Sequence, residues 1–234
     1  MLNVADHFDS FDVSSGSIDL SRKLAAQSNL TGISYITADL NKAVLEKNKY
    51  SCVFASMSLH HIENLEGLFE QVESALVPGG LFIFNEYVGP NRFQWTDQQL
   101  RWINLLLTAL PEKYKRDIAT PGIVKMDVKR VSIEQMIEID PTEAVRSDSI
   151  LPIVYIMFEE IKTVRYGGTI LHMLLDRIGG NFQEVDKCDK ALLQIFCSTE
   201  AELVDSGVLP SDFVVCVLRK RALSAKEDII NWTP

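Results

Sequence analysis

The sequence predicts an α/β fold in which helices cover a mostly parallel sheet. Its first half alternates short apolar segments with amphipathic ones, which is typical of right-handed βαβ units. The segment 50–55 (YSCVFA) is apolar on both faces, as expected of a parallel strand buried between helices. A chain of 234 residues is long enough to bury one such domain together with an inserted cap.

The first part of the chain is predicted to contain four strands and two helices. The strands are expected at 9–13, 33–36, 50–55 and 81–85, and the helices at 17–27 and 65–76. The helix 17–27 carries apolar residues at close to helical spacing. The sequence Pro78-Gly79-Gly80 ends the helix 65–76 and turns the chain into the fourth strand.

The pattern changes after Gly89. Helices are expected at 96–110, 132–139, 142–157, 169–178 and 188–206, and strands at 160–166 and 212–218. Thr96 or Asp97 is expected to begin the first of these helices. Residues 112–131 are polar and basic for this chain, which predicts an exposed loop. The tail 224–234 is expected to fray.

Composition excludes several classes of function. A net charge of -9 argues against a nucleic-acid binder, because Lys and Arg are needed to grip phosphates. No apolar run reaches the roughly 18 residues of a membrane helix, and the N-terminus lacks the pattern of a secretory signal. The four cysteines are scattered without CxxC spacing, so neither structural zinc nor a disulfide framework is expected. A cytoplasmic protein is the resulting expectation.

Two acids follow the first two predicted strands. Asp12 lies at the end of one strand, before small residues and a helix, and Asp39 follows the next. Ligands of α/β sheets bind at the carboxyl ends of the strands, where Asp12 can accept bonds from both ribose hydroxyls. Asp39 can accept a bond from an adenine amino group. The alternative is that Asp12 braces a helix N-terminus and Asp39 a turn.

A third feature is FASMSLHHI, residues 54–62, directly after a buried strand. Its small residues allow a ligand to approach the backbone, and His60 or His61 can act as a general base near neutral pH. The alternative is that one imidazole caps a helix or packs in the core. Because the two are adjacent, at most one is expected to face a pocket. A metal site is a further alternative with little support, since no other His or Cys is close in sequence, and no metal is assigned here.

A fourth feature is ALVPGGLFIFNEYVG, residues 75–89, in which an apolar strand ends at Glu86. Glu86 emerges at the same edge of the sheet as the features above and is a candidate catalytic contact to substrate. The alternative is a solvated strand end.

In their order and spacing, the four features resemble the class I methyltransferases that use S-adenosylmethionine. The resemblance covers about residues 8 to 90 and implies a Rossmann-like sheet with an antiparallel last strand. It implies catalytic roles for His60, His61 and Glu86. It also implies contacts to the cofactor. The residues expected to make them are Asp12, Val13, Asp39, Leu40, Ala55, Ser56 and Met57.

Later segments, among them YVGPNRFQWTDQQL and YGGTILHMLL, look like a bacterial subgroup of these enzymes without a defined substrate. Four residues that follow the active edge are expected to wall the acceptor pocket: Tyr87, Arg92, Phe93 and Trp95. Arg92 is available for a carboxylate or phosphate, and Arg146 and Tyr166 are further candidates. The alternative for the aromatic residues is packing of the cap.

One family feature is missing. The resemblance implies a first strand and a glycine-rich loop before the first helix, but no Gly-x-Gly occurs anywhere in the chain. That strand would lie at the centre of the sheet, between the strands at 9–13 and 50–55. Either these two strands pair directly, or a partner chain supplies the missing strand, or the sequence is part of a longer protein that contains it. The third is the expectation. The predicted division is a truncated cofactor-binding core at 1–90, a helical cap at 91–157, sheet-completing strands and helices at 158–220, and a tail at 221–234.

The predicted activity is methyl transfer from S-adenosylmethionine to an unidentified small molecule. One rival is an inactive fragment or pseudoenzyme that acts as a binding module, with a homo-oligomer or a partner chain covering the open sheet. The other is a nicotinamide-dependent oxidoreductase, against which the segments 54–62 and 78–80 and the antiparallel last strand argue.

Overall fold

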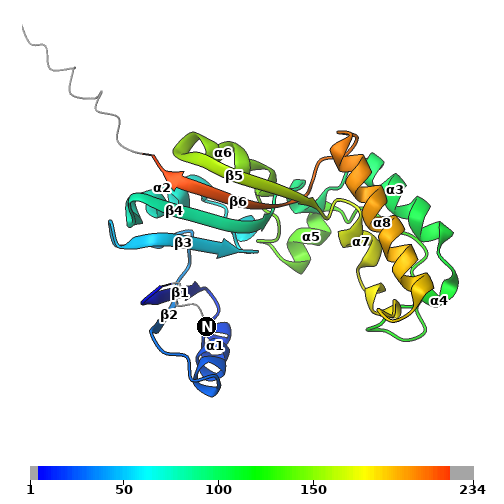
Figure 1. Cartoon of the computed structure of the whole chain (residues 1–234), viewed down its shortest axis with the longest axis horizontal. Coiled ribbons are helices and arrows are strands. Elements are labelled where there is room, and N and C mark those ends of the chain that lie inside the picture. Colours follow the sequence, from blue (N-terminus) through cyan, green and yellow to red (C-terminus); the bar gives the residue numbers. More distant parts are fainter. Residues whose placement is uncertain (1–4, 222–234) are drawn as a thin grey trace, which may run out of the picture.

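A computed structural model describes residues 5–221 and contains two sheets and a group of helices (Figure 1). The smaller sheet pairs β1 (Phe8–Asp12) and β2 (Ile33–Thr37) in parallel. The larger sheet has the strand order β3-β4-β6-β5. Its strands are β3 (Tyr50–Ser56), β4 (Leu76–Tyr87), β5 (Phe158–Gly167) and β6 (Phe213–Lys220). β3 and β4 are parallel, and β6 is antiparallel to both of its neighbours, as expected for the last strand.

The smaller sheet and α1 (Ser15–Gln27) form a βαβ unit of their own, which Figure 1 shows beneath β3. Ser14 caps the helix by accepting a hydrogen bond from the Ser17 amide at 3.2 Å. Asp9 links the unit to the larger sheet, because it accepts a hydrogen bond from the Tyr50 hydroxyl (2.7 Å) and pairs with Lys49 (3.0 Å). Those hydrogen bonds, that from Tyr50 first, lower the pKa of Asp9 to about 2.

Within residues 5–221, β1 and β3 belong to separate sheets, so these two strands do not close the gap between them by pairing directly. The expectation that the strand at 50–55 is buried on both faces is wrong. Val53 and Ala55 pack on the core, but Phe54 on the opposite face is 65% exposed. The reason is that β3 is covered by helices on one face only.

The first hydrophobic core lies between one face of the larger sheet and the helices α2 (Leu65–Ala75) and α6 (Ile150–Met157). Phe69 of α2 meets Phe82 of β4 at a ring-centroid distance of 5.9 Å, and Phe158 of β5 lies 5.4 Å from Phe82. Asn64 caps α2 by accepting a hydrogen bond from the Gly67 amide at 3.1 Å. The sequence Pro78-Gly79-Gly80 is absorbed as an irregularity in β4, between the pairs Tyr50–Leu76 and Cys52–Leu81.

A second core joins helices from two separate stretches of the chain. They are α3 (Asp97–Ala109), α4 (Glu112–Lys115), α7 (Leu171–Leu175) and α8 (Lys187–Asp205). Figure 1 shows these helices together at one end of the molecule, beyond the ends of β5 and β6, while α5 (Ile133–Ile139) lies nearer the sheet. Ile103, Leu107 and Ile170 are fully buried in this second core.

Three expectations about local structure need correction. The predicted exposed loop 112–131 contains α4, and its Tyr114 and Val128 are buried in the second core. The helix expected at 142–157 begins at Ile150, because Ser147 is buried and its hydroxyl donates to the Gly89 carbonyl in the turns before it. The helix expected at 169–178 is reduced to α7, since Asp176 leaves helical geometry.

Within residues 5–221, none of the helices combines the length and the apolar character needed to cross a membrane. The tail expected to fray at 224–234 lies outside the described residues.

Candidate functional site

The two acids after β1 and β2 lie at the same edge of the smaller sheet. Asp12 pairs in register with Thr37, and the Ala38 amide donates to the Asp12 carbonyl at 2.9 Å, so the segments that carry Asp12 and Asp39 run side by side. Asp12 Oδ1 accepts a hydrogen bond from the Ser14 amide at 2.7 Å, whereas its Oδ2 bonds to no other residue that the structure describes. One oxygen therefore braces the helix start, and the other has no partner among residues 5–221.

Asp39 is more fully occupied by its own turn. Its Oδ1 accepts from the Asn41 amide at 3.0 Å, and its Oδ2 lies 3.1 Å from Lys42 Nζ. The bond from Lys42 and those from Asn41 lower the pKa of Asp39. An open hollow of about 450 Å³ borders this turn. Its lining residues are Asp39, Asn41, Lys42, Glu63 and Asn64.

Asn41 connects this hollow to the segment that follows β3. Its side-chain oxygen accepts hydrogen bonds from the amides of Glu63 (2.9 Å) and Asn64 (3.1 Å), just after the two histidines. Among the other residues expected at the cofactor, Leu40 packs on the first core and Met57 is exposed with φ 49°. Further exposed positions here are Val13 and Ser56, while Ala55 is half-buried.

Glu86 is fully buried, so it is not the solvated strand end that was the alternative for it. Its Oε2 accepts from the amides of Ser58 (2.7 Å) and Leu59 (2.6 Å), and its Oε1 accepts from the Tyr87 amide (2.6 Å) and from His60 Nδ1 (2.5 Å). With both oxygens engaged, Glu86 holds the His60 ring and the turn that carries it.

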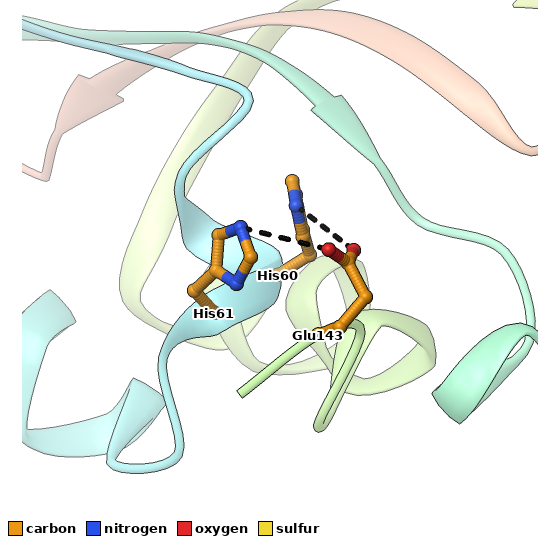
Figure 2. A group of neighbouring side chains, drawn as sticks. All are labelled: His60, His61 and Glu143. Atoms are coloured by element: carbon orange, nitrogen blue, oxygen red, sulfur yellow. Dashed lines mark ion pairs between the residues drawn. The ribbon is translucent and has the colours of Figure 1, made fainter. Parts of the chain in front are cut away.

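The two histidines occupy a single turn of 3₁₀ helix, η1 (Leu59–His61), and Figure 2 shows their rings beside Glu143. Glu143 Oε1 lies 3.4 Å from His60 Nε2, and Glu143 Oε2 lies 4.0 Å from His61 Nε2. Burial acts to lower the pKa of His60, but the hydrogen bond that His60 donates to Glu86 and the negative charges of Glu86 and Glu143 outweigh it and raise that pKa. His60 side-chain exposure is 7%, and that of His61 is 36%.

The residues expected to wall an acceptor pocket are packed together. Tyr87 and Trp95 are buried, and Phe93 stacks on Trp95 at a centroid distance of 5.2 Å. Arg92 Nη1 donates to the carbonyls of Pro141 (2.6 Å) and Glu143 (3.2 Å), so the guanidinium braces the turn that holds Glu143. This is the cap-packing arrangement, and a substrate role for these four residues stays a prediction.

The two further candidates are also engaged. Arg146 makes a two-pronged contact with Glu66, with distances of 2.7 and 2.6 Å. Tyr166 is exposed, and its hydroxyl donates to Asn85 Oδ1 at 2.7 Å. Tyr166 therefore remains the more accessible of the two.

Glu143 and Thr142 are the residues that the sequence analysis missed. Thr142 Oγ1 lies 3.1 Å from His61 Nδ1, although the two residues are 81 positions apart in the chain. They stand in the sequence IDPTEAV, where the expected helix 142–157 was to begin and where the structure has turns instead. No local signal marks them, because only the packing of the cap against the sheet edge brings them to the histidines.

Comparison with known sequences gives a family match for the first part of the chain. The model described as "Methyltransferase domain" matches residues 3–84. A malonyl-[acyl-carrier protein] O-methyltransferase of Ilyobacter polytropus is 32% identical over 82 residues, which is 35% of this chain and 30% of that protein. A sterol 24-C-methyltransferase of Candida albicans is 26% identical over 94 residues, or 39% of this chain and 25% of that protein. The chain thus spans less than a third of the length of these relatives.

Comparison with solved structures concerns the fold. A phosphoethanolamine N-methyltransferase of Haemonchus contortus in complex with S-adenosyl-L-methionine matches at TM-score 0.51 and 15% identity, over 92% of this chain and 43% of that one. A geranyl diphosphate C-methyltransferase of Streptomyces coelicolor matches at TM-score 0.51 and 12% identity, over 91% and 61%. The [4+2]-cyclase SpnF also matches, at TM-score 0.50 and 12% identity, over 92% and 66%. The fold is shared, and the fold alone does not specify the reaction.

Proposed function

Because residues 3–84 match the family model described as a methyltransferase domain and the chain shares the fold of class I S-adenosylmethionine-dependent methyltransferases, we propose that it transfers a methyl group from S-adenosylmethionine to a small-molecule acceptor. The observation that carries the proposal is the placement of Asp12 and Asp39 side by side at the carboxyl edge of β1 and β2. That edge is where the sheets of α/β proteins bind ligands.

The residues at this edge fit the adenosine part of the cofactor. Asp12 has one carboxylate oxygen free, which suits a ribose hydroxyl as donor. Asp39 borders an open hollow and is held at low pKa, so it is an anionic acceptor for an amino group. Backbone groups near Leu40 and the exposed segment Ser56–Met57 are the proposed remaining contacts. Residues 5–221 provide no glycine-rich loop for the methionine part.

The bound cofactor supplies an electrophilic methyl group, and the work of the chain is to place the acceptor in line with it. An acceptor hydroxyl or ammonium must lose a proton, and His60 or His61 is the proposed base at this edge. Glu86 is proposed as a positioning residue, because both of its oxygens are engaged in holding His60 and the surrounding turn. The acceptor itself is unassigned.

The four cysteines are all free, which fits a reducing compartment, and we place the activity in the cytoplasm.

Calorimetric titration with S-adenosylmethionine tests the proposal. We expect micromolar binding by the intact chain. Asp12→Ala should weaken binding about 10- to 100-fold, because it removes a charged hydrogen-bond acceptor. Asp19→Ala on the exposed face of α1 is the matched control and should leave the affinity unchanged. Loss of methyl transfer in a double His60→Ala and His61→Ala variant that still binds the cofactor would support the proposed base.

A second candidate is a methyltransferase-like module that binds a partner without catalysis. The observation that favours it is the separation of the two sheets, since β1 and β3 are not paired with each other in the described part of the chain. Unpaired strand edges attract other strands. Absence of S-adenosylmethionine binding at millimolar concentration would decide for this candidate and against methyl transfer.

A further inference from the structure

We propose that His60, His61 and Glu143 form a binding site for one divalent transition-metal ion of the zinc type. The ligand atoms of the three side chains all lie within 4.8 Å of one another. Figure 2 shows both imidazoles turned toward the carboxylate. The site follows from this geometry and does not depend on the methyl-transfer proposal.

The spacing of the ligand atoms suits a metal ion. Four ligands at about 2.1 Å around a tetrahedral ion lie about 3.4 Å from one another. His60 Nε2 is 3.4 Å from the nearer oxygen of Glu143, and His61 Nε2 is 4.0 Å from the other oxygen. A small rotation of the partly exposed His61 and Glu143 side chains brings all three atoms to coordinating distance.

Both imidazoles are oriented by a partner on their other nitrogen. His60 Nδ1 donates to Glu86 at 2.5 Å, and His61 Nδ1 donates to the Thr142 hydroxyl at 3.1 Å, which in turn donates to Asp140 at 2.8 Å. In this tautomer each Nε2 presents its lone pair toward Glu143. Metal-binding histidines in proteins are held in the same way, by a carboxylate or another acceptor behind the ring.

The backbone around the cluster is also braced. The Val145 amide donates to the His60 carbonyl at 3.0 Å, which ties the two segments together. Arg92 binds the carbonyl of Glu143 at 3.2 Å, and the Arg92 amide donates to the Ala144 carbonyl at 2.7 Å. Three ligands from two distant segments are thus held in place by the fold, which is what a preformed metal site requires.

The ligand set indicates the kind of ion. Two imidazoles and one carboxylate suit Zn²⁺, Fe²⁺, Co²⁺ or Ni²⁺, whereas Mg²⁺ and Ca²⁺ prefer oxygen ligands alone. Three protein ligands leave a position open for water or another small oxygen ligand. The side-chain exposure of His61 (36%) and Glu143 (23%) gives the ion a path from solvent.

Metal binding and a general-base role exclude each other for the two histidines. A coordinated Nε2 cannot accept a proton, so in a metal-loaded chain neither histidine could be the base that deprotonates the acceptor. Only this consequence rests on the proposed function.

The test is titration of the metal-stripped full chain with Co²⁺, followed by the visible absorption of the coordinated ion. We expect one ion per chain. His61→Ala and Glu143→Gln should each weaken binding more than about 100-fold, because a three-ligand site loses a third of its donors. His7→Ala, which alters an exposed histidine just before β1, is the matched control and should bind as the intact chain does.

Thr142→Val adds a readout that leaves the ligands untouched. It removes the partner of His61 Nδ1 from an exposed position and should weaken Co²⁺ binding about 10-fold. The proposed site is overturned if the intact chain shows no absorption from coordinated Co²⁺. It is also overturned if the His61→Ala and Glu143→Gln variants bind Co²⁺ as tightly as the intact chain does. Calorimetry with S-adenosylmethionine on the same sample separates the two proposals, because either ligand can bind when the other does not.

Discussion

Two carboxylates, Glu86 and Asp212, are fully buried but differ in what they contact. Glu86 receives hydrogen bonds on both oxygens from backbone amides and His60. Asp212 Oδ2 accepts from Gln99 at 2.9 Å, while its Oδ1 has no partner in the described chain. Burial, with the nearby charge of Glu200, raises the pKa of Asp212 to about 7. Asp212 is therefore a carboxyl group that is costly to ionise in the folded state.

Replacing Asp212 by Asn should change how stability depends on pH. The folded pKa of about 7 lies above the unfolded value of 3.8, so the native state binds more protons between these limits. The contribution of Asp212 to the free energy of unfolding should therefore fall as pH rises from about 4 to 7, and then level off. Asp212→Asn should lack this loss. The difference in the free energy of unfolding between the two proteins should therefore grow by about 2–4 kcal/mol as pH rises over this range.

Urea unfolding at pH 5 and pH 8 measures this difference. Asp19→Asn, at an exposed position of α1, is the control and should follow the intact chain at both pH values. If Asp212→Asn and the intact chain lose stability in parallel, Asp212 is already ionised in the folded protein.

At the scale of elements, local capping decides where several helices begin. Thr96 caps α3 through a capping box: its hydroxyl accepts from the Gln99 amide at 3.2 Å, and the Thr96 amide donates to the Gln99 side chain at 2.8 Å. This motif is contained in four consecutive residues, and it begins at Thr96, one of the two residues that the sequence predicted for the helix start.

Thr96→Ala should lower the free energy of unfolding by about 1 kcal/mol, because it leaves the Gln99 amide without its acceptor. The matched control is Thr108→Ala, on an exposed position of the same helix, which should change stability by less than about 0.5 kcal/mol. Denaturant unfolding followed by far-UV circular dichroism gives both values. If both substitutions lower the free energy of unfolding by the same amount, the Thr96 cap does not contribute to the stability of the helix.

The elements that the sequence misjudged depend on distant contacts. β3 has the composition of a strand buried on both faces, yet Phe54 is exposed because only the opposite face of β3 packs on the core. The stretch 112–131 is polar in composition, yet Tyr114 and Val128 are buried against helices that come much later in the chain. Composition reports what a segment can bury and not what lies opposite it.

At the scale of the whole molecule, stability is expected to be uneven. The β1–α1–β2 unit buries few side chains, among them Ile18 and Ala25 of α1. The larger sheet buries Phe82 and Phe84 of β4 and Cys216 of β6 completely. Local unfolding is easiest where few apolar side chains are buried.

Hydrogen exchange should therefore separate the two sheets. Amides of β4 and β6 are expected to exchange at least about 100-fold more slowly than those of β1 and β2. Peptide-resolved exchange measured by mass spectrometry provides the comparison within one sample. Equal protection of the two sheets would mean that the smaller unit is stabilised as strongly as the larger sheet.

The sequence by itself determined the order of strands and helices in the first ninety residues, and it identified the acids after β1 and β2 and the histidine pair after β3. These depend on periodicity and on residues next to each other, which the chain carries locally. Only the tertiary structure decided that Glu86 is buried behind His60 and that Glu143 and Thr142 stand beside the histidines. Such contacts join segments far apart in sequence, and the packing of one core against another creates them.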